Sequence, residues 1–299
     1  MIGSNFAFSG RCALYVALGL LCASLPAGAQ PGSLLNISTR ARVNTSDNLD
    51  EILIGGFIVR GSARVTKRIL VRAIGPSLAE RGVSGALTDT VLAIYDHGTL
   101  IAGNTNWRDT QEAEIIATTI PPTNDLESAV VLNLAAGEYT ALVYGTRDTL
   151  ISPGDPAGRG VALVEIYDLD AASPTRMVNL SSRGPVGTGD DVMIGGFIIG
   201  NASLRVLARA IGPSLGNGGF PGPLQDTMLE LYNASGDSIA SNDNWRDTQE
   251  AEIAATTIPP PDDREAALVA TLTPGNYTAV LRGKNNTTGR ALVEFYALD

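Results

Sequence analysis

The chain has 299 residues and a mass of 31.1 kDa, with 44% hydrophobic and 17% charged residues, 33 glycines and 16 prolines. This composition is typical of a globular, turn-rich protein and excludes a disordered chain or a long coiled coil. The net charge of −10 argues against a nucleic-acid partner, because phosphate backbones would repel the chain. Lys67 and Lys284 are the only lysines, so the sequence has no polybasic patch for anionic lipid.

The first predicted element is a cleaved export signal over residues 1–29. Arg11 precedes an apolar run that ends at Leu25, and Ala27-Gly28-Ala29 has the small-x-small form of a signal peptidase site. The run is shorter than the roughly 20 residues that span a bilayer, so we expect no membrane insertion after cleavage before Gln30. The mature protein is then exported, to the periplasm, the cell surface or the medium.

Both cysteines, Cys12 and Cys22, belong to this predicted signal. The mature chain therefore has no thiol, which excludes cysteine catalysis, disulfides and thiolate metal sites. Its stability has to come from the apolar core.

An internal duplication organises the mature chain. The decapeptide Asn-Trp-Arg-Asp-Thr-Gln-Glu-Ala-Glu-Ile occurs at 106–115 and recurs unchanged at 244–253. Matching segments extend in both directions from it, so we expect two domains in series: repeat 1 (residues 30–170), a linker (residues 171–176) and repeat 2 (residues 177–299).

Repeat 1 carries insertions relative to repeat 2, and these predict exposed turns. Insertions are tolerated where the backbone is exposed and fail inside paired strands. The predicted turns lie at 44–50, near 62–66 and at 148–159.

The apolar runs within each repeat are short, β-branched and bounded by Gly, Pro, Asn or Asp, which is typical of strands. Thr273-Pro274-Gly275-Asn276 predicts a turn between two of them. The predicted fold class is all-β, with two tandem antiparallel β-sandwich domains of jelly-roll type. In repeat 2 we expect strands near 192–199, 204–211, 228–232, 237–241, 266–272, 276–282 and 290–297, with equivalents in repeat 1.

One short helical segment is predicted in each repeat, at the decapeptide. In repeat 2, Asp247 can cap the amide three residues on while Glu250 reaches back, as in a capping box. Pro259 and Pro260 end the segment.

Oxygen-bearing side chains cluster in the sequence around the second decapeptide. Asn242, Asp243, Asn244 and Asp247 offer hard ligands of the type that calcium takes, and calcium is the one cofactor that the sequence suggests. The spacing does not fit an EF-hand loop. The alternative is that these side chains form turns and cap the helix, which the weaker charge of repeat 1, with Thr105 in place of Asp243, also favours.

Trp107 and Trp245 are the candidate ligand-binding aromatics, since an exposed indole can stack on a sugar ring. The alternative is that each packs its segment onto the sandwich, with the indole N–H bonded to a loop carbonyl. Solvent exposure of the two indoles separates these hypotheses.

Two further patterns are found in hydrolases, but neither has the context that hydrolysis needs. Gly212-Pro213-Ser214-Leu215-Gly216 matches the nucleophile-elbow pattern, yet the only histidine, His97, lies upstream in the other repeat. The carboxylates Glu112 and Glu114, like Glu250 and Glu252, are two residues apart and face different sides of a helix. No catalytic residue is therefore predicted.

Arg72 and Arg209 lie in otherwise apolar strands. Because a lone buried charge is costly, each needs an acidic partner or a route to the surface. We expect structural ion pairs with Glu165 and Glu294 on the last strand of each repeat.

Repeat 2 contains a series of short motifs in a fixed order: Leu229-Glu230-Leu231-Tyr232, Gly236, Ile239-Ala240, Pro274-Gly275-Asn276-Tyr277-Thr278 and Gly283. This series resembles bacterial prepeptidase C-terminal-type modules, which are secreted β-sandwiches attached to exported enzymes or surface proteins. Repeat 1 departs from the pattern at its turn, Ala136-Gly137-Glu138-Tyr139. The resemblance implies an accessory, binding or surface role and transfers no catalytic residue.

These observations favour an exported, non-catalytic tandem β-sandwich protein with a binding or structural role. Its partner would be an extracellular polymer or protein. The alternative is a carbohydrate-binding protein that uses exposed tryptophan, and a secreted hydrolase is the third hypothesis.

Overall fold

The computed structural model describes residues 31–43, 52–62, 64–146 and 158–298. The predicted signal peptide and most of the turns predicted at 44–50 and 148–159 lie outside the described residues. The described part of the turn predicted near 62–66 is a loop between two strands. No helix in the described ranges is both long and apolar enough to cross a membrane.

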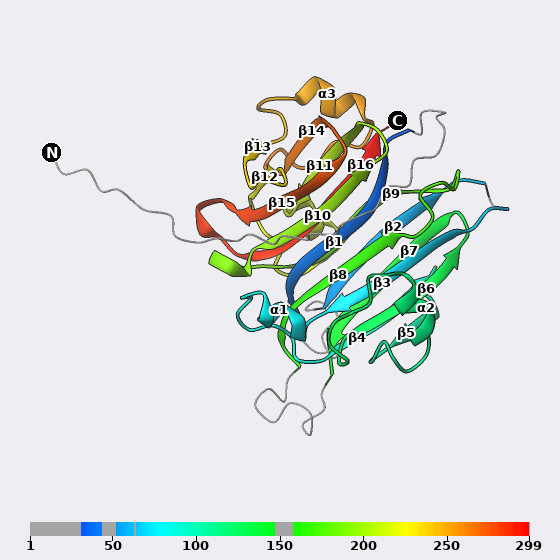
Figure 1. The fold of residues 1–299 in the computed structure, drawn as a ribbon. Helices are drawn as coiled ribbons and strands as arrows, with labels where there is room; N and C mark the ends of the chain where they lie inside the picture. Colours follow the sequence, from blue (N-terminus) through cyan, green and yellow to red (C-terminus); the bar gives the residue numbers. More distant parts are fainter. Residues whose placement is uncertain (1–30, 44–51, 63, 147–157, 299) are drawn as a thin grey trace.

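Each repeat contributes strands of similar length and order (Figure 1). Repeat 1 forms β1 (Ser33–Val43), β2 (Leu53–Arg60), β3 (Lys67–Ile74), β4 (Thr90–Asp96), β5 (Thr99–Asn104), β6 (Ser128–Leu134), β7 (Gly137–Gly145) and β8 (Gly160–Asp168). Repeat 2 forms β9 (Arg176–Val186), β10 (Met193–Gly200), β11 (Leu204–Ile211), β12 (Thr227–Tyr232), β13 (Ser238–Asn242), β14 (Ala266–Leu272), β15 (Gly275–Gly283) and β16 (Gly289–Leu298).

The strands form two eight-stranded antiparallel sheets, so the prediction of an all-β antiparallel fold is confirmed. Sheet A has the order β13-β12-β15-β10-β1-β8-β3-β6, and sheet B has the order β14-β11-β16-β9-β2-β7-β4-β5. The strands β1 to β8 correspond in order to β9 to β16. When each strand is replaced by its equivalent, the order of sheet A becomes the order of sheet B read backwards. The duplication in the sequence is therefore also a symmetry of the fold.

Both sheets run continuously from one repeat into the other, and each repeat contributes four neighbouring strands to each sheet. β1 pairs with β10 in sheet A, from Ser33 opposite Gly200 to Arg40 opposite Ile194. β2 pairs with β9 in sheet B, from Ile54 opposite Arg183. The physical reason is that each repeat alone would end in open strand edges at this point, and pairing satisfies their backbone groups.

The joining strands β1 and β9 are absent from the predicted strand set. Their sequences carry many polar residues, which suggest a surface segment, yet Asn36 and Asn179 are 4% and 3% exposed. The Asn36 amide donates to Ile166 O at 3.3 Å, and the Asn179 amide donates to Phe295 O at 3.1 Å. Side-chain hydrogen bonds thus allow these strands to lie in the middle of the molecule.

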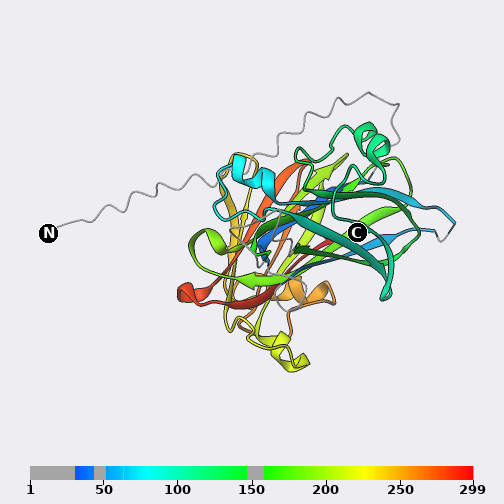
Figure 2. The ribbon, with the colours of Figure 1, turned by 90° about the horizontal axis from the view of Figure 1, so that it is seen from below.

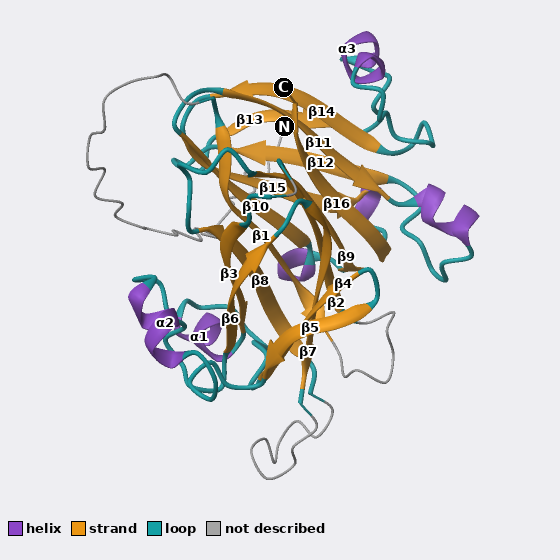
Figure 3. Cartoon of the chain, turned by 90° about the vertical axis from the view of Figure 1, so that its right-hand side faces the viewer, coloured by secondary structure: helices purple, strands orange, loops and turns teal. Residues whose placement is uncertain are grey.

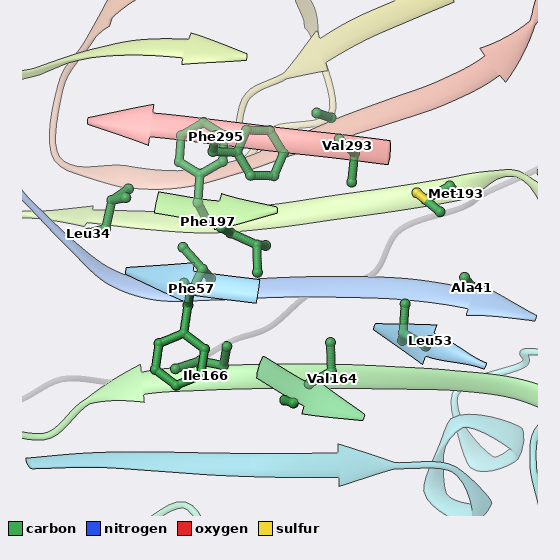
Figure 4. Close-up of a cluster of buried hydrophobic side chains, with 14 of the residues drawn as sticks. Leu34, Ala41, Leu53, Phe57, Val164, Ile166, Met193, Phe197, Val293 and Phe295 are labelled. Atoms are coloured by element: carbon green, nitrogen blue, oxygen red, sulfur yellow. The ribbon is translucent and has the colours of Figure 1, made fainter. Parts of the chain in front are cut away.

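One hydrophobic core lies between the sheets and crosses the junction of the repeats (Figure 4). Phe197 contacts Phe295 with ring centroids 4.8 Å apart. Gly195 permits this arrangement, because a Cβ at that position would lie 2.6 Å from the Phe295 ring. The shared core gives the two repeats a common source of stability.

The helical segments are short, and α1, α2 and α3 lie at the margins of the strand layers (Figures 2 and 3). The prediction of a helix at the decapeptide is confirmed, but the predicted capping box is wrong. α3 begins after Gln249, which makes no side-chain cap bond. These segments are α1 (Pro76–Glu80), α2 (Glu112–Ala117), η2 (Gly189–Asp191), η3 (Pro213–Gly218), α3 (Glu250–Ala255) and η4 (Lys284–Asn286).

Candidate functional site

The repeated decapeptide lies over the last strand of a sheet in each repeat. In repeat 1 it connects β5 to α2 and runs along β6, the edge strand of sheet A. In repeat 2 it connects β13 to α3 and runs along β14, the edge strand of sheet B. Figure 3 shows α2 and α3 at opposite ends of the molecule. A backbone bond holds each segment in place, from Trp107 N to Glu127 O and from Trp245 N to Glu265 O, both at 2.9 Å.

The two tryptophans are buried, with 2% of Trp107 and 3% of Trp245 exposed. The guanidinium groups of Arg108 and Arg246 lie 4.1 Å from the respective ring centroids. The Trp107 indole donates to Asn124 O at 3.1 Å, as predicted, whereas Trp245 Nε1 has no partner among the described residues. The candidate assignment of these rings to a ligand does not hold, because neither presents a face to solvent.

The arginine of each decapeptide joins acidic side chains above the tryptophan. Arg246 Nε donates to Asp263 at 2.6 Å, and Arg246 Nη1 also pairs with Glu250. Glu252 pairs separately with Arg205 at 2.8 Å. The same ion pairs recur in repeat 1, where Arg108 contacts Asp125 and Glu112, and Arg68 contacts Glu114. The paired carboxylates are thus held by arginines on the surface.

The amide side chains of repeat 1 bind the outer backbone of β6. Asn104 donates to Ala129 O at 2.6 Å and accepts from Ala129 N at 3.1 Å. Gln111 donates to Val131 O and accepts from Val131 N, both at 3.0 Å. Alternate residues of a strand direct their N–H and C=O groups to the same side, so these two amides take the place of a further strand.

The same arrangement protects β14 in repeat 2. Asn242 accepts from Ala267 N at 2.9 Å, while Gln249 donates to Val269 O at 2.8 Å and accepts from Val269 N at 3.0 Å. Unpaired strand edges invite pairing with other chains. We define β6 and β14 as the sealed edges, because side-chain amides occupy their outer backbone groups.

Replacing Gln249 with alanine should open the sealed edge at β14. We expect a loss of stability of roughly 1 kcal/mol, the usual net value of hydrogen bonds that water can replace. The larger effect should be self-association, seen as species larger than the wild-type protein forms when light scattering is measured at rising concentration. Glu250→Ala, one residue along on the surface, is the matched control. Equal scattering of the two variants would refute a sealing role for Gln249.

The predicted calcium ligands are engaged within the protein. Asn242 binds the backbone of β14, and Asn244 Nδ2 donates to Asp247 Oδ2 at 3.0 Å. Lys284 Nζ lies 2.5 Å from Asp243 Oδ2, so an ammonium group already neutralises this carboxylate. Within the described ranges, no three His, Cys, Asp or Glu side chains gather in a way that could hold a metal ion.

Asp226 lies on the other side of the same lysine, with Asp226 Oδ2 at 4.0 Å from Lys284 Nζ. Burial raises the pKa of Asp226. The Oδ1 atoms of Asp226 and Asp243 are buried without a partner among the described residues. In repeat 1 the equivalents of Lys284 and Asp243 are the neutral Thr146 and Thr105. Repeat 2 therefore has both the lysine and the aspartate at this position, and repeat 1 has neither.

We expect calcium and a chelator to leave the melting temperature of the wild-type protein unchanged, since Lys284 supplies the cation beside Asp243. A ligand that binds only the folded state would raise the melting temperature. Differential scanning calorimetry with calcium chloride and with EDTA measures this. Lys284→Thr, which introduces the repeat 1 residue, should melt at a lower temperature. A calcium-dependent rise for the wild-type protein would contradict this prediction and restore Asp243 and Asp247 as ligands.

The predicted ion pairs inside the strands are confirmed. Arg72 pairs with Glu165, and Arg209 pairs with Glu294, with both carboxylates nearly buried. Arg209 also donates to Ile258 O at 2.7 Å. Tyr296 donates to Glu294 at 2.8 Å, and burial, reinforced by the Glu294 charge, raises the pKa of Tyr296 to about 12.

The serine of the elbow-like pattern has a structural partner. Ser214 Oγ donates to Glu265 Oε1 at 2.6 Å, and Glu265 also accepts from Ser214 N at 3.0 Å and Gly212 N at 2.9 Å. His97 is an exposed turn residue bonded to Asp96 at 2.6 Å. That hydrogen bond raises the pKa of His97. Ser214 and His97 are therefore each bonded to a different acid and not to each other.

Sequence reasoning missed the buried acids of the Gly-Pro-Ser-Leu segments. Glu127 and Glu265 are 0% exposed and accept from the backbone at the start of α1 and η3. A signal was present, since both repeats place a glutamate directly before an apolar strand. It also missed Lys67, which is 0% exposed and pairs with Asp168 at 2.6 Å. An alignment of the two repeats carries a signal for this pair. Leu204 and Ala297 occupy the equivalent positions in repeat 2, so both charged residues are replaced by apolar ones at the same time.

A cavity of about 320 Å³ lies near the junction of the repeats, lined in part by Arg42, Asp191 and Arg290. Arg42 pairs with Asp191 at 2.7 Å. None of the candidate site residues lines this cavity.

No family model and no curated protein matches the chain. The chain is similar to a solved structure described as the atomic structure of Sulfolobus Turreted Icosahedral Virus, with a TM-score of 0.21 and 11% identity, covering 90% of this chain and 88% of that chain. That similarity is too weak to support any functional argument. The resemblance to prepeptidase C-terminal-type modules stays a prediction.

Proposed function

We propose that the protein is an exported, non-catalytic protein with a binding or structural role at the cell surface or outside the cell. The observation that carries this proposal is the use of the repeated decapeptide. Its tryptophan is buried, its arginine pairs with acids, and its glutamine binds an edge strand. In both repeats the side chains of this motif contact the protein itself. This supports a role that the surface of the folded protein performs, without a catalytic centre.

The states of the reactive side chains also support a non-catalytic role. Ser214 donates to a buried glutamate, His97 is an exposed turn residue, and Glu250 and Glu252 each pair with an arginine. Nucleophilic catalysis needs a base within hydrogen-bond reach of the nucleophile. Glycoside hydrolysis needs two free carboxyl groups facing one substrate. The tryptophan-based carbohydrate alternative loses its support, because both indoles are covered.

Export is supported by the leader pattern and by cysteine usage. Both cysteines of the chain, Cys12 and Cys22, precede the predicted cleavage point. The mature protein would fold without thiol chemistry, through a core shared by its two repeats. The proposed partner is an extracellular polymer or protein.

Cell fractionation tests the export proposal. The full chain with a C-terminal tag should appear outside the cytoplasm with Gln30 as its first residue, as N-terminal sequencing would show. Ala29→Phe should block cleavage while leaving the described residues unchanged. Recovery of the wild-type chain in the cytoplasm with an intact leader would refute export.

A retention assay tests the non-catalytic role. The purified exported protein is incubated with insoluble cell-wall polysaccharides, and both the bound protein and any soluble products are measured. We expect no release of soluble fragments from any polymer. Release of fragments that Ser214→Ala abolishes would establish the hydrolase hypothesis instead.

A further inference from the structure

The four sheet edges differ in how their backbone is protected. Side-chain amides cover the sealed edges β6 and β14. The opposite ends of the sheets are β5 and β13, and within the described part of the chain β5 pairs with β4 alone, and β13 with β12 alone. The described part of each molecule therefore has two open edges, which are equivalent under exchange of the repeats.

Exposed aliphatic side chains gather at these open edges. Leu100 and Ile101 on β5 are 59% and 40% exposed, and Ile239 on β13 is 43% exposed. Met228, on the neighbouring strand β12, is 37% exposed. Ile116 on α2 is the one other large apolar side chain exposed to this degree among the described residues. Exposed apolar residues are normally scattered singly over a protein surface, whereas here most of them lie at or beside an open edge. This grouping indicates that the open edges contact another protein surface.

β5 is the more apolar of the two edges. Its six residues, Thr99–Asn104, include no charged residue and no proline, the usual devices that keep an edge strand unpaired. Leu100 lies opposite Tyr95 on β4, so both face the same side of sheet B. At the equivalent positions, repeat 2 has Ser238 opposite Tyr232.

The neighbouring strands reinforce this difference. On the outer face of repeat 2, Arg282 pairs with Glu230 at 3.0 Å, which places an ion pair beside the β13 edge. Repeat 1 has Tyr144 and Ala93 at these positions. The face that adjoins β5 is therefore free of that ion pair and more suitable for burial against another protein surface.

The chain itself indicates what an open edge of this repeat binds. β1 of repeat 1 pairs antiparallel with β10 of repeat 2, and β2 pairs antiparallel with β9, so two copies of the unit join edge to edge and continue both sheets. We propose that β5 pairs antiparallel with β5 of a second copy of this chain. The resulting dimer extends sheet B across both molecules and buries Leu100 and Ile101 of each. This inference does not rest on the proposed function.

Measurement of the mass in solution tests the proposal. Sedimentation equilibrium of the exported protein should give a dimer that dissociates on dilution. Leu100→Ser, which introduces the repeat 2 residue, and Ile101→Lys should each shift the dissociation constant upward by at least about tenfold, the effect of losing roughly 1.4 kcal/mol of binding free energy. Both side chains are exposed in the monomer, so circular dichroism and the melting temperature at low concentration should match the wild type.

The matched control is Ile239→Lys, which places the same charge on the equivalent open edge at β13. It should leave the dimer intact. A wild-type protein that is monomeric at every accessible concentration would overturn the proposal and leave the edge to a foreign strand. A dimer that Ile239→Lys dissociates, or that neither β5 substitution weakens, would also overturn it.

Discussion

Replacing Lys67 with leucine is expected to lower the free energy of unfolding by about 3–5 kcal/mol, the usual cost of leaving a buried charge without its partner. Lys67 is 0% exposed, pairs with Asp168 at 2.6 Å and donates to Asp170 O at 2.5 Å. The lysine therefore also holds the end of repeat 1, directly before the linker. Chemical denaturation, followed by the change in the midpoint, measures the loss.

The second repeat supplies the matched control for this substitution. Its equivalent positions are occupied by Leu204 and Ala297, so the double variant Lys67→Leu with Asp168→Ala copies an arrangement that the fold already tolerates. We expect the double variant to be more stable than Lys67→Leu alone, because no uncompensated charge remains. A double variant less stable than both single variants would show that the ion pair itself stabilises the fold.

The loss should also depend on pH. Burial raises the pKa of Asp168 above its ordinary value of 3.8, while the hydrogen bond and charge of Lys67 lower it. For an acid whose pKa is higher in the folded state, stability is greatest below the ordinary pKa and falls as pH rises through the folded pKa. Lys67→Leu removes the lowering contributions, so its destabilisation should be largest at neutral pH and shrink in acid. A deficit that is constant from neutral to acidic pH would exclude Asp168 as its source.

The strands that the sequence predicts well are those with a clear apolar pattern. The segment predicted near 204–211 is β11 with the same bounds, and that near 266–272 is β14. The ion pair of Arg209 with Glu294 was also predictable, because a charge within an apolar strand requires a partner. In these places local chemistry determines the structure.

The joining strands escaped prediction because their environment is created by the other repeat. Thr39 and Ser182 are 0% exposed, yet in the sequence they lie in polar segments that resemble surface. Pairing of β1 with β10 and of β2 with β9 buries them. The two joining strands were thus missed for one physical reason, which is that their burial depends on pairing with strands far away in the sequence.

The decapeptide shows a similar limit for the candidate site. Its composition suggested calcium ligands, an exposed tryptophan and a capped helix. Its actual contacts depend on which strand lies beneath it, since Gln249 binds the backbone of β14, which begins 17 residues after Gln249. The exact repetition singled out this segment in the sequence, and the fold shows that its glutamine binds the backbone of an edge strand and its arginine pairs with acids.

Replacing Glu265 with alanine is expected to lower the free energy of unfolding by about 3–5 kcal/mol, because buried N–H groups left without an acceptor cost about 1–3 kcal/mol each. The carboxylate is 0% exposed and accepts from Gly212 N at 2.9 Å, from Ser214 N at 3.0 Å and from Asp262 N at 3.2 Å. It therefore fixes the start of η3 to the loop before β14. Thermal and chemical unfolding measure the loss.

Two further variants separate this bonding from other effects of the substitution. Glu265→Gln retains one acceptor oxygen in a side chain of the same shape, so it should lose roughly 1–2 kcal/mol. Glu250→Ala removes an exposed carboxylate that pairs with Arg246, and should lose less than about 1 kcal/mol, as surface ion pairs do. If Glu265→Ala were no more damaging than Glu250→Ala, the Gly-Pro-Ser-Leu segment would not depend on the glutamate. Ser214 would then be released from its structural role, and the elbow-like pattern would again be a candidate for chemistry.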